Sequence, residues 1–229
     1  MDLNKLFDSI EEVIVRIASW FIFIPITLYK IYKHPSKITG FVQTELDKDN
    51  NQFTNVVSPV LLWTLLVILP LYPVLSNGEI FKPLLNSNSF EEGFLLLAMS
   101  FTLITVTPAI VIFILTKKRA ETEKFKILFF VQCYIQAAFF FPAILFYAVL
   151  KYYSFEWFPQ KSPDYYFFVF IICTLLLSIW FIYAQVKVIK QELAFKGLRI
   201  FLTLLLMYAL FIILIIVSFE LYFILFDIR

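Results

Sequence analysis

Histidine and cysteine are almost absent from this chain of 229 residues, which contains one His and two Cys. A zinc centre needs several His, Cys or acidic ligands close together, and the single histidine, His34, precedes the long apolar segments. Cys133 and Cys173 both fall inside apolar segments, which is typical of buried, reduced thiols and not of a disulfide framework. The sequence therefore predicts no metal site and no other bound cofactor.

Charged residues are also scarce. They make up 16% of the chain, while hydrophobic residues make up 61%, whereas about a quarter of the residues in an average globular protein are charged. A net charge of +2 is too small to indicate nucleic-acid binding. We therefore expect one polytopic membrane domain whose partners are the lipid bilayer and other membrane proteins, with no nucleic acid among them.

The motifs of common enzyme classes are missing as well. The chain has no Gly-x-Ser-x-Gly elbow and no Gly-x-x-x-x-Gly-Lys phosphate loop. No Asp, Glu, Lys, Arg or His lies near the middle of a long apolar segment, although proton- or ion-coupled carriers ordinarily need an ionisable group there. The sequence predicts a non-enzymatic protein.

Long apolar runs dominate what is present. Residues 200–219 contain no charge, and such a run gains on the order of 5–10 kcal/mol by entering lipid as a helix. We predict an all-α, polytopic transmembrane helix bundle in which residues 58–229 form the membrane domain. Its five spans are expected at 58–76, 93–116, 127–150, 165–186 and 198–226.

Basic residues alternate in number between the two sides of these spans. Of the 19 Lys and Arg residues, 15 fall on the side of the N-terminus and 4 on the other. The positive-inside rule then predicts a cytoplasmic N-terminus and an external C-terminus. The many Phe and few Gly residues suggest an AT-rich coding genome and hence a bacterial cytoplasmic membrane.

The segment 1–57 before the spans begins with an amphipathic pattern. Its apolar residues recur every three or four positions, which predicts one helix. They are Leu3, Phe7, Ile10, Ile14, Ile17, Phe21, Ile24, Leu28 and Ile31. The uncharged part is too short to span a membrane and contains Pro25, so we expect an interfacial helix bent into the membrane surface. A coiled-coil seam to another subunit is the alternative.

A second, shorter amphipathic helix is expected after His34. The apolar residues Ile38, Phe41, Val42 and Leu46 indicate it, with Ser36 as its N-terminal cap and a polar run from Asp47 as its end.

Polar and small residues form stripes on three of the predicted spans. In the second span the stripe joins Ala98, Thr102, Thr105 and Ala109; in the third it joins Gln132 and Gln136; in the fourth it joins Thr174, Ser178 and Gln185. Such residues in lipid usually mark contacts between helices, where they hydrogen-bond across the interface. The alternative is that they line a path for a substrate or an ion.

The arrangement resembles a known family. A cytoplasmic amphipathic N-terminal segment, the entry His34-Pro-Ser36, and Ser58-Pro-Val-Leu-Leu-Trp63 opening the first of five spans are similar to the Yip1-like family of five-span membrane proteins. The Asp-Leu-Tyr-Gly-Pro motif of its eukaryotic members is missing, so their role in membrane traffic does not carry over. The resemblance implies a non-enzymatic integral protein that binds other membrane proteins.

These observations predict a subunit or organiser of a membrane protein assembly. The alternative is a homo-oligomeric pore, a membrane-perturbing effector or a small transporter. In either case the functional residues are expected at helix interfaces or along a pore lining, at Thr102, Thr105, Gln132, Gln136, Thr174, Ser178 and Gln185.

Overall fold

The computed structural model describes residues 3–48, 52–53, 56–70, 90–116, 122–153 and 163–226. Within these ranges the chain forms helices and the turns between them, and no strand occurs. The predicted all-α class is therefore confirmed. Residues 71–76 of the first predicted span lie outside the described residues, and the last predicted span ends at 226, where the described residues end.

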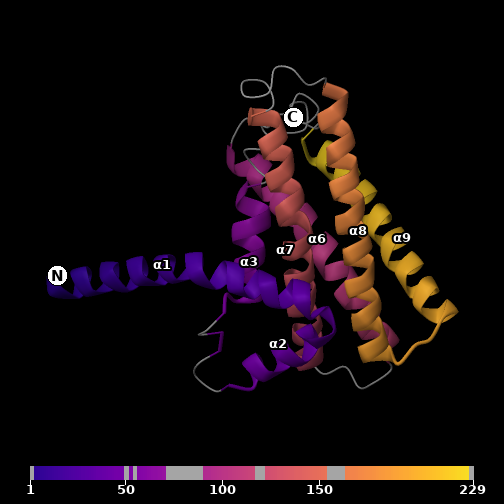
Figure 1. The fold of residues 1–229 in the computed structure, drawn as a ribbon, viewed down its shortest axis with the longest axis horizontal. Helices are drawn as coiled ribbons and strands as arrows, with labels where there is room; N and C mark the ends of the chain where they lie inside the picture. Colours follow the sequence, from indigo (N-terminus) through magenta and orange to yellow (C-terminus); the bar gives the residue numbers. More distant parts are fainter. Residues whose placement is uncertain are drawn as a thin grey trace.

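Five helical segments run side by side and form a bundle (Figure 1). They are α3 (Pro59–Trp63), which continues through a wide turn at Thr64–Ile68, then α6 (Phe90–Leu115), α7 (Thr122–Tyr153), α8 (Pro163–Leu193) and α9 (Leu198–Phe226). The first of them begins at Ser58-Pro59 as predicted: the Ser58 side chain accepts a hydrogen bond from the backbone N–H of Leu61, and proline fits the first turn because it lacks an N–H.

The helix α7 is the centre of the bundle. It packs against α6, α3, α8 and the short helix α2 (Ile38–Leu46), and residues 131–138 are all buried. Within the described ranges, two helical segments are long and apolar enough to cross a membrane, Thr122–Phe146 and Ile171–Leu193. Of these windows, 56% is buried in α7 and only 17% in α8. The helix α8 therefore presents most of its apolar surface to the outside.

Each of the other three predicted spans contains a shorter apolar helical stretch: Pro59–Ile68, Phe101–Leu115 and Leu198–Leu210. The helices α7 and α8 also extend beyond the apolar ranges 127–150 and 165–186. Hydrophobicity identifies the residues that can enter lipid, but it does not set where a helix ends. A helix continues through polar residues, such as Lys187 to Glu192, as long as its backbone hydrogen bonds are made. An ion pair of 3.4 Å between Lys124 and Glu192 joins these extended ends.

The N-terminal helix α1 (Leu3–Lys33) lies across the direction of the bundle (Figure 1). Pro25 lies within it. Its C-terminal part is fixed to the bundle, because Thr27 Oγ1 accepts a hydrogen bond of 3.3 Å from the backbone N–H of Val57. The carbonyl of Val57 accepts a bond of 2.8 Å from the Tyr134 hydroxyl of α7. Helices α1 and α7 thus hold the entry to α3 from two sides.

The short helix α2 (Ile38–Leu46) occurs where it was predicted and ends at Asp47. The predicted cap at Ser36 is wrong. Ser36 lies within a tight 3₁₀ turn, Pro35–Lys37, and the residue that precedes α2 is Lys37, without a side-chain cap. The turn runs directly into α2, and the N–H of Ile38 donates to the Pro35 carbonyl. Backbone acceptors from the turn therefore replace a side-chain cap.

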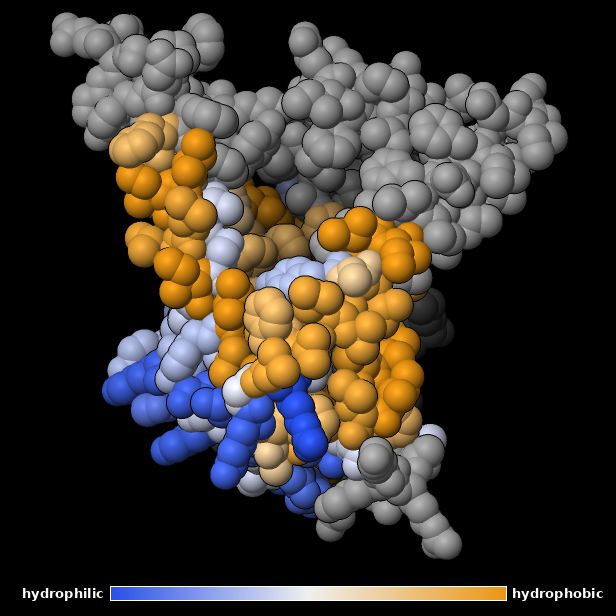
Figure 2. Space-filling view, turned by 90° about the vertical axis from the view of Figure 1, so that its right-hand side faces the viewer, coloured by the Kyte–Doolittle hydropathy of each residue, from blue (hydrophilic) through white to orange (hydrophobic). Residues whose placement is uncertain are grey.

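One end of the bundle is basic. There α7 begins, α8 ends and α9 begins, and these segments carry Lys124, Lys126, Lys187, Lys190, Lys196 and Arg199. Figure 2 shows hydrophilic side chains gathered near this end, with an apolar surface next to them. Several cations lie over aromatic rings, including Lys187 at 5.1 Å from the Tyr183 ring centre and Arg199 at 5.9 Å from that of Phe195.

Candidate functional site between helices α6, α7, α8 and α9

A proline inside α6 leaves one backbone carbonyl without its helical partner. Pro108 has no N–H, so the carbonyl four residues earlier, that of Ile104, loses the donor that a helix normally provides. The side chain of Gln136 in α7 supplies a replacement: its Nε2 donates to the Ile104 carbonyl oxygen at 3.5 Å. A proline break in one helix is thus bridged by a side chain of the next.

A second proline break lies in α7. Pro142 is inside this helix, and the carbonyl four residues earlier belongs to Ala138. The hydroxyl of Tyr32, from α1, donates to this carbonyl. The Tyr32 ring also packs at 4.9 Å from the Trp180 ring of α8. Burial raises the pKa of Tyr32 to about 12, because the charged phenolate is disfavoured away from water.

Two glutamines form a closed pair between α7 and α8. Gln132 Nε2 donates to Gln185 Oε1 at 3.2 Å, and Gln185 Nε2 donates to Gln132 Oε1 at 2.8 Å. Both residues are buried. The two amides satisfy each other's oxygen and one hydrogen of each nitrogen, so this pair acts as a contact between helices.

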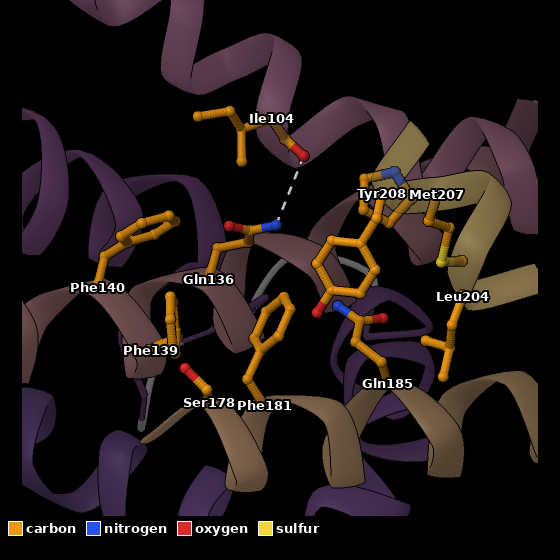
Figure 3. Close-up of a pocket in the computed structure, with 11 residues that line it drawn as sticks. Ile104, Gln136, Phe139, Phe140, Ser178, Phe181, Gln185, Leu204, Met207 and Tyr208 are labelled. Carbon is orange, nitrogen blue, oxygen red and sulfur yellow. Dashed lines mark hydrogen bonds between the residues drawn. The ribbon is translucent and has the colours of Figure 1, made fainter. Parts of the chain in front are cut away.

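A cavity of about 180 Å³ lies beside these bonds, between α6, α7, α8 and α9. Figure 3 shows the side chains that surround it. They are Ile104 and Pro108 from α6; Gln136, Phe139 and Phe140 from α7; Ser178, Phe181 and Gln185 from α8; and Leu204, Met207 and Tyr208 from α9.

The polar side chains of this lining differ in whether their hydrogen-bonding atoms have partners. Gln185 is engaged by Gln132, and the Ser178 hydroxyl donates to the Thr174 carbonyl oxygen at 2.8 Å. Gln136 is only 2% exposed, and its Oε1 has no hydrogen-bond partner among the described residues. In Figure 3 its nitrogen is turned toward Ile104 and its oxygen away from that carbonyl. Gln136, a residue of the lining, therefore keeps one unpaired acceptor atom that is itself buried.

The predicted site residues divide into two groups. Gln136, Ser178 and Gln185 come together around the cavity, and Gln132 joins them through its bond to Gln185. Thr102, Thr105 and Thr174 do not line it. Thr102 is exposed and donates to the Ala98 carbonyl, while Thr105 is buried and donates to the Phe101 carbonyl, so both hydroxyls bond within α6.

Sequence reasoning missed Tyr32 and Tyr134, whose hydroxyls join distant parts of the chain. The positions of the prolines give part of the information needed to find these contacts, because each proline leaves the carbonyl four residues earlier without its helical donor. Which side chain reaches that carbonyl depends on how the helices pack.

The residues that line the cavity suit the binding of a ligand better than catalysis by charged side chains. Among the described residues that line the cavity, Tyr208 is the only one with an ionisable side chain. In the described part of the chain, no group of three or more His, Cys, Asp or Glu side chains could hold a metal ion. No protein-family model, curated protein or solved structure matches this chain.

Proposed function

We propose that the protein is an integral membrane protein with five spans, at 58–76, 93–116, 127–150, 165–186 and 198–226, in a bacterial cytoplasmic membrane. Two long apolar helices and three shorter apolar stretches, one in each predicted span, support this proposal. The helices α6 to α9 run alternately up and down (Figure 1), as successive spans must. The resemblance to the Yip1-like family belongs to the same proposal, since it rests on this topology.

The basic end supports the proposed orientation. The ends of α7, α8 and α9 that carry Lys124, Lys187 and Arg199 lie together, and the positive-inside rule assigns such an end to the cytoplasm. A reporter domain fused after Arg229 should then be active only outside the cytoplasm, and one inserted at residues 117–121 only inside. The reverse pattern would contradict this orientation, and reporters active on the same side at both positions would contradict the five-span topology.

The proposal includes an interfacial position for α1. Its predicted apolar row has two parts: Leu28 and Ile31 are 9% and 2% exposed and pack on the bundle, whereas Phe21 is 78% exposed. Other large apolar side chains of α1 are exposed too, namely Val15, Ile17, Ile22, Ile26 and Tyr29. A helix lying across the bundle with such a surface fits the boundary of a membrane.

A spin label at Phe21 tests this position. It should report contact with lipid, while a label at the exposed, charged Glu11 should report water. Equal exposure to water at both sites would favour a free arm or the coiled-coil alternative.

Within the membrane we propose a non-enzymatic role as a subunit or organiser of a protein assembly. The observation that carries this proposal is the closed pair Gln132–Gln185, because amides that bond to each other do not line a water-filled path. The outer face of α8 also offers an apolar surface to a partner, with Leu176 and Ile179 at 62% and 64% exposed.

Partner capture in mild detergent tests the role. The double variant Leu176→Ala, Ile179→Ala should reduce the amount of co-purified membrane protein without changing the unfolding temperature, since both side chains are exposed. The control is Ile114→Ala on α6, which removes an equally exposed apolar side chain elsewhere. Unchanged capture by the double variant would remove this face from the proposal.

A conductance measurement covers the alternative of a homo-oligomeric pore. Purified protein in planar bilayers should give no ion current. A reproducible current that Gln136→Leu abolishes would overturn the organiser and favour the pore, because an apolar constriction is prone to dewetting.

A further inference from the structure

A second pocket lies where the end of α1, the short helix α2 and the last turn of α8 meet. Its volume is about 580 Å³, which falls in the range of about 300–1,000 Å³ that ligand sites usually have. The turn Pro35–Lys37 packs against α8 and joins α1 to α2, which lies below α1 in Figure 1. We call it the basic pocket, and the lining residues that matter here are Lys30, His34, Lys37, Phe41 and Gln191.

The basic pocket carries positive charge. Lys30, His34 and Lys37 line it and are exposed to solvent. No Asp or Glu belongs to the described residues of the lining. The pocket therefore attracts an anion.

The acidic residues of α2 and of the end of α8 are engaged elsewhere. Glu45 of α2 is buried and pairs with Lys48, and Glu192 of α8 pairs with Lys124 of α7. Asp47 follows the last residue of α2, whose nine residues span about 13 Å, so it lies at the opposite end of this helix from the basic turn. These carboxylates leave the positive charge of the pocket largely uncompensated.

The lining also provides hydrogen-bond donors from three elements. Lys30 comes from α1, Lys37 from the turn before α2, and Gln191 from α8. The Lys30 ammonium lies 5.5 Å from the centre of the Phe41 ring of α2, a cation–π distance that ties it to the other side of the pocket. Lysine ammonium groups bind phosphate oxygens, and an amide N–H can add a further bond. A phosphate group is therefore the anion that this lining suits.

The surface next to the basic pocket indicates that the phosphate belongs to a lipid. Ile22 and Ile26 precede Lys30 in steps of four residues, which places the three along one side of α1. Ile22 and Ile26 are 63% and 40% exposed. A ligand that reaches the cations from this side meets exposed apolar side chains, which suit acyl chains and offer nothing to a free phosphate ion.

We propose that the basic pocket binds the phosphate group of an anionic phospholipid, whose acyl chains extend along Ile26 and Ile22 into the membrane. This assignment rests on the proposed position of α1 at the membrane boundary. Basic pockets on the cytoplasmic side of membrane proteins are known to hold anionic headgroups. A zwitterionic headgroup adds an ammonium group that Lys30 and Lys37 repel, so it binds less tightly.

Amine labelling tests the pocket one lysine at a time. The full chain, purified in a neutral detergent and freed of lipid, is labelled while phosphatidylglycerol replaces phosphatidylcholine in the micelles at constant total lipid. Mass spectrometry of peptides gives the labelling rate of each lysine relative to Lys126, which is exposed at the same end of the bundle. Phosphatidylglycerol should slow the labelling of Lys30 and Lys37 saturably, because bound phosphate shields both amines. Phosphatidylcholine alone, or inorganic phosphate at the same concentration, should not.

Two variants of equal charge show whether the lysines act together. Lys37→Gln should raise the concentration of phosphatidylglycerol that half-protects Lys30 about five-fold, as expected for the loss of one lysine near a membrane surface. Lys196→Gln is the matched control, since it removes the same charge from an exposed position outside the pocket. It should leave the protection of Lys30 unchanged.

The proposal is overturned if Lys30 and Lys37 are slowed no more than Lys126, since a general surface potential then explains the effect. It is also overturned if phosphatidylcholine or inorganic phosphate protects as well as phosphatidylglycerol, or if the two variants behave alike. The spin label at Phe21 keeps the two proposals apart. Contact of that label with lipid, without protection of the lysines, removes the lipid site alone, whereas a label in water removes the interfacial helix and the lipid assignment with it.

Discussion

In two helices of the bundle a proline leaves a backbone carbonyl without its helical donor, and a different kind of side chain supplies the replacement in each. At Pro142 the freed carbonyl of Ala138 receives the hydroxyl of Tyr32, which has a single hydrogen to donate. At Pro108 the freed carbonyl of Ile104 receives the amide of Gln136 at 3.5 Å, and the other end of that amide stays unpaired beside a cavity. The two prolines lie in the neighbouring helices α6 and α7. Only at Pro108 does the side chain that bonds to the freed carbonyl keep an unpaired polar atom, Gln136 Oε1.

The difference follows from the number of polar atoms in each bridging side chain. The phenol of Tyr32 has a single polar atom, which bonds to the Ala138 carbonyl while the ring packs on Trp180. An amide has an acceptor as well as donors, so closing the break with its nitrogen leaves its oxygen to be satisfied. The pair Gln132–Gln185 provides a third case, in which two amides leave no oxygen unpaired.

The largest effect is expected at this amide pair. Gln132→Leu removes both bonds and leaves the buried amide of Gln185 without its partner, which should cost about 2–3 kcal/mol of unfolding free energy. The double variant Gln132→Leu, Gln185→Leu should recover most of this loss, because no polar group is then left unpaired. Unfolding in mixed micelles measures both values. A double variant as unstable as the single one would mean that shape, and not pairing, matters at this contact.

A smaller loss is expected when the Pro142 break is opened. Tyr32→Phe leaves the ring in place but deprives the Ala138 carbonyl of its donor, which should cost about 1–2 kcal/mol. The same substitution should cost less in a Pro142→Ala background, since the alanine N–H can bond that carbonyl. Tyr29→Phe is the control, because the Tyr29 hydroxyl is exposed and bonds only to Lys33 among the described residues. Equal costs in both backgrounds would show that the Tyr32 hydroxyl does not compensate for the donor that Pro142 lacks.

The smallest effect is expected at the Pro108 break. Gln136→Leu removes a long bond but also removes the unpaired oxygen, and these two changes oppose each other, so the net cost should be below about 1 kcal/mol. Pro108→Ala should reduce this cost further. A loss at Gln136 larger than that at Tyr32 would reverse the comparison and indicate that Gln136 is mainly a structural residue.

Local sequence determined the helices and some of their limits. The start at Ser58-Pro59, the helix Ile38–Leu46 and the full extent of α9 could be predicted, because capping, turn residues and apolar runs act over a few neighbouring positions. The positions of Pro108 and Pro142 in helices would also have pointed to the carbonyls of Ile104 and Ala138 as groups in need of donors, although our sequence analysis did not identify them. The cap at Ser36 failed because the backbone of a preceding turn took its place.

Only the tertiary structure decided which polar side chains meet. Gln132 and Gln136 stand on one face of α7, yet one is paired with Gln185 and the other lies at the cavity with a free oxygen. Thr102 and Thr105 belong to one predicted stripe, yet one is exposed and the other buried. The sequence determined that these residues lie on helices and near which faces. The rotation and depth of each helix against its neighbours, set by the packing of side chains far apart in the chain, decided which of them are satisfied and which acceptor remains open.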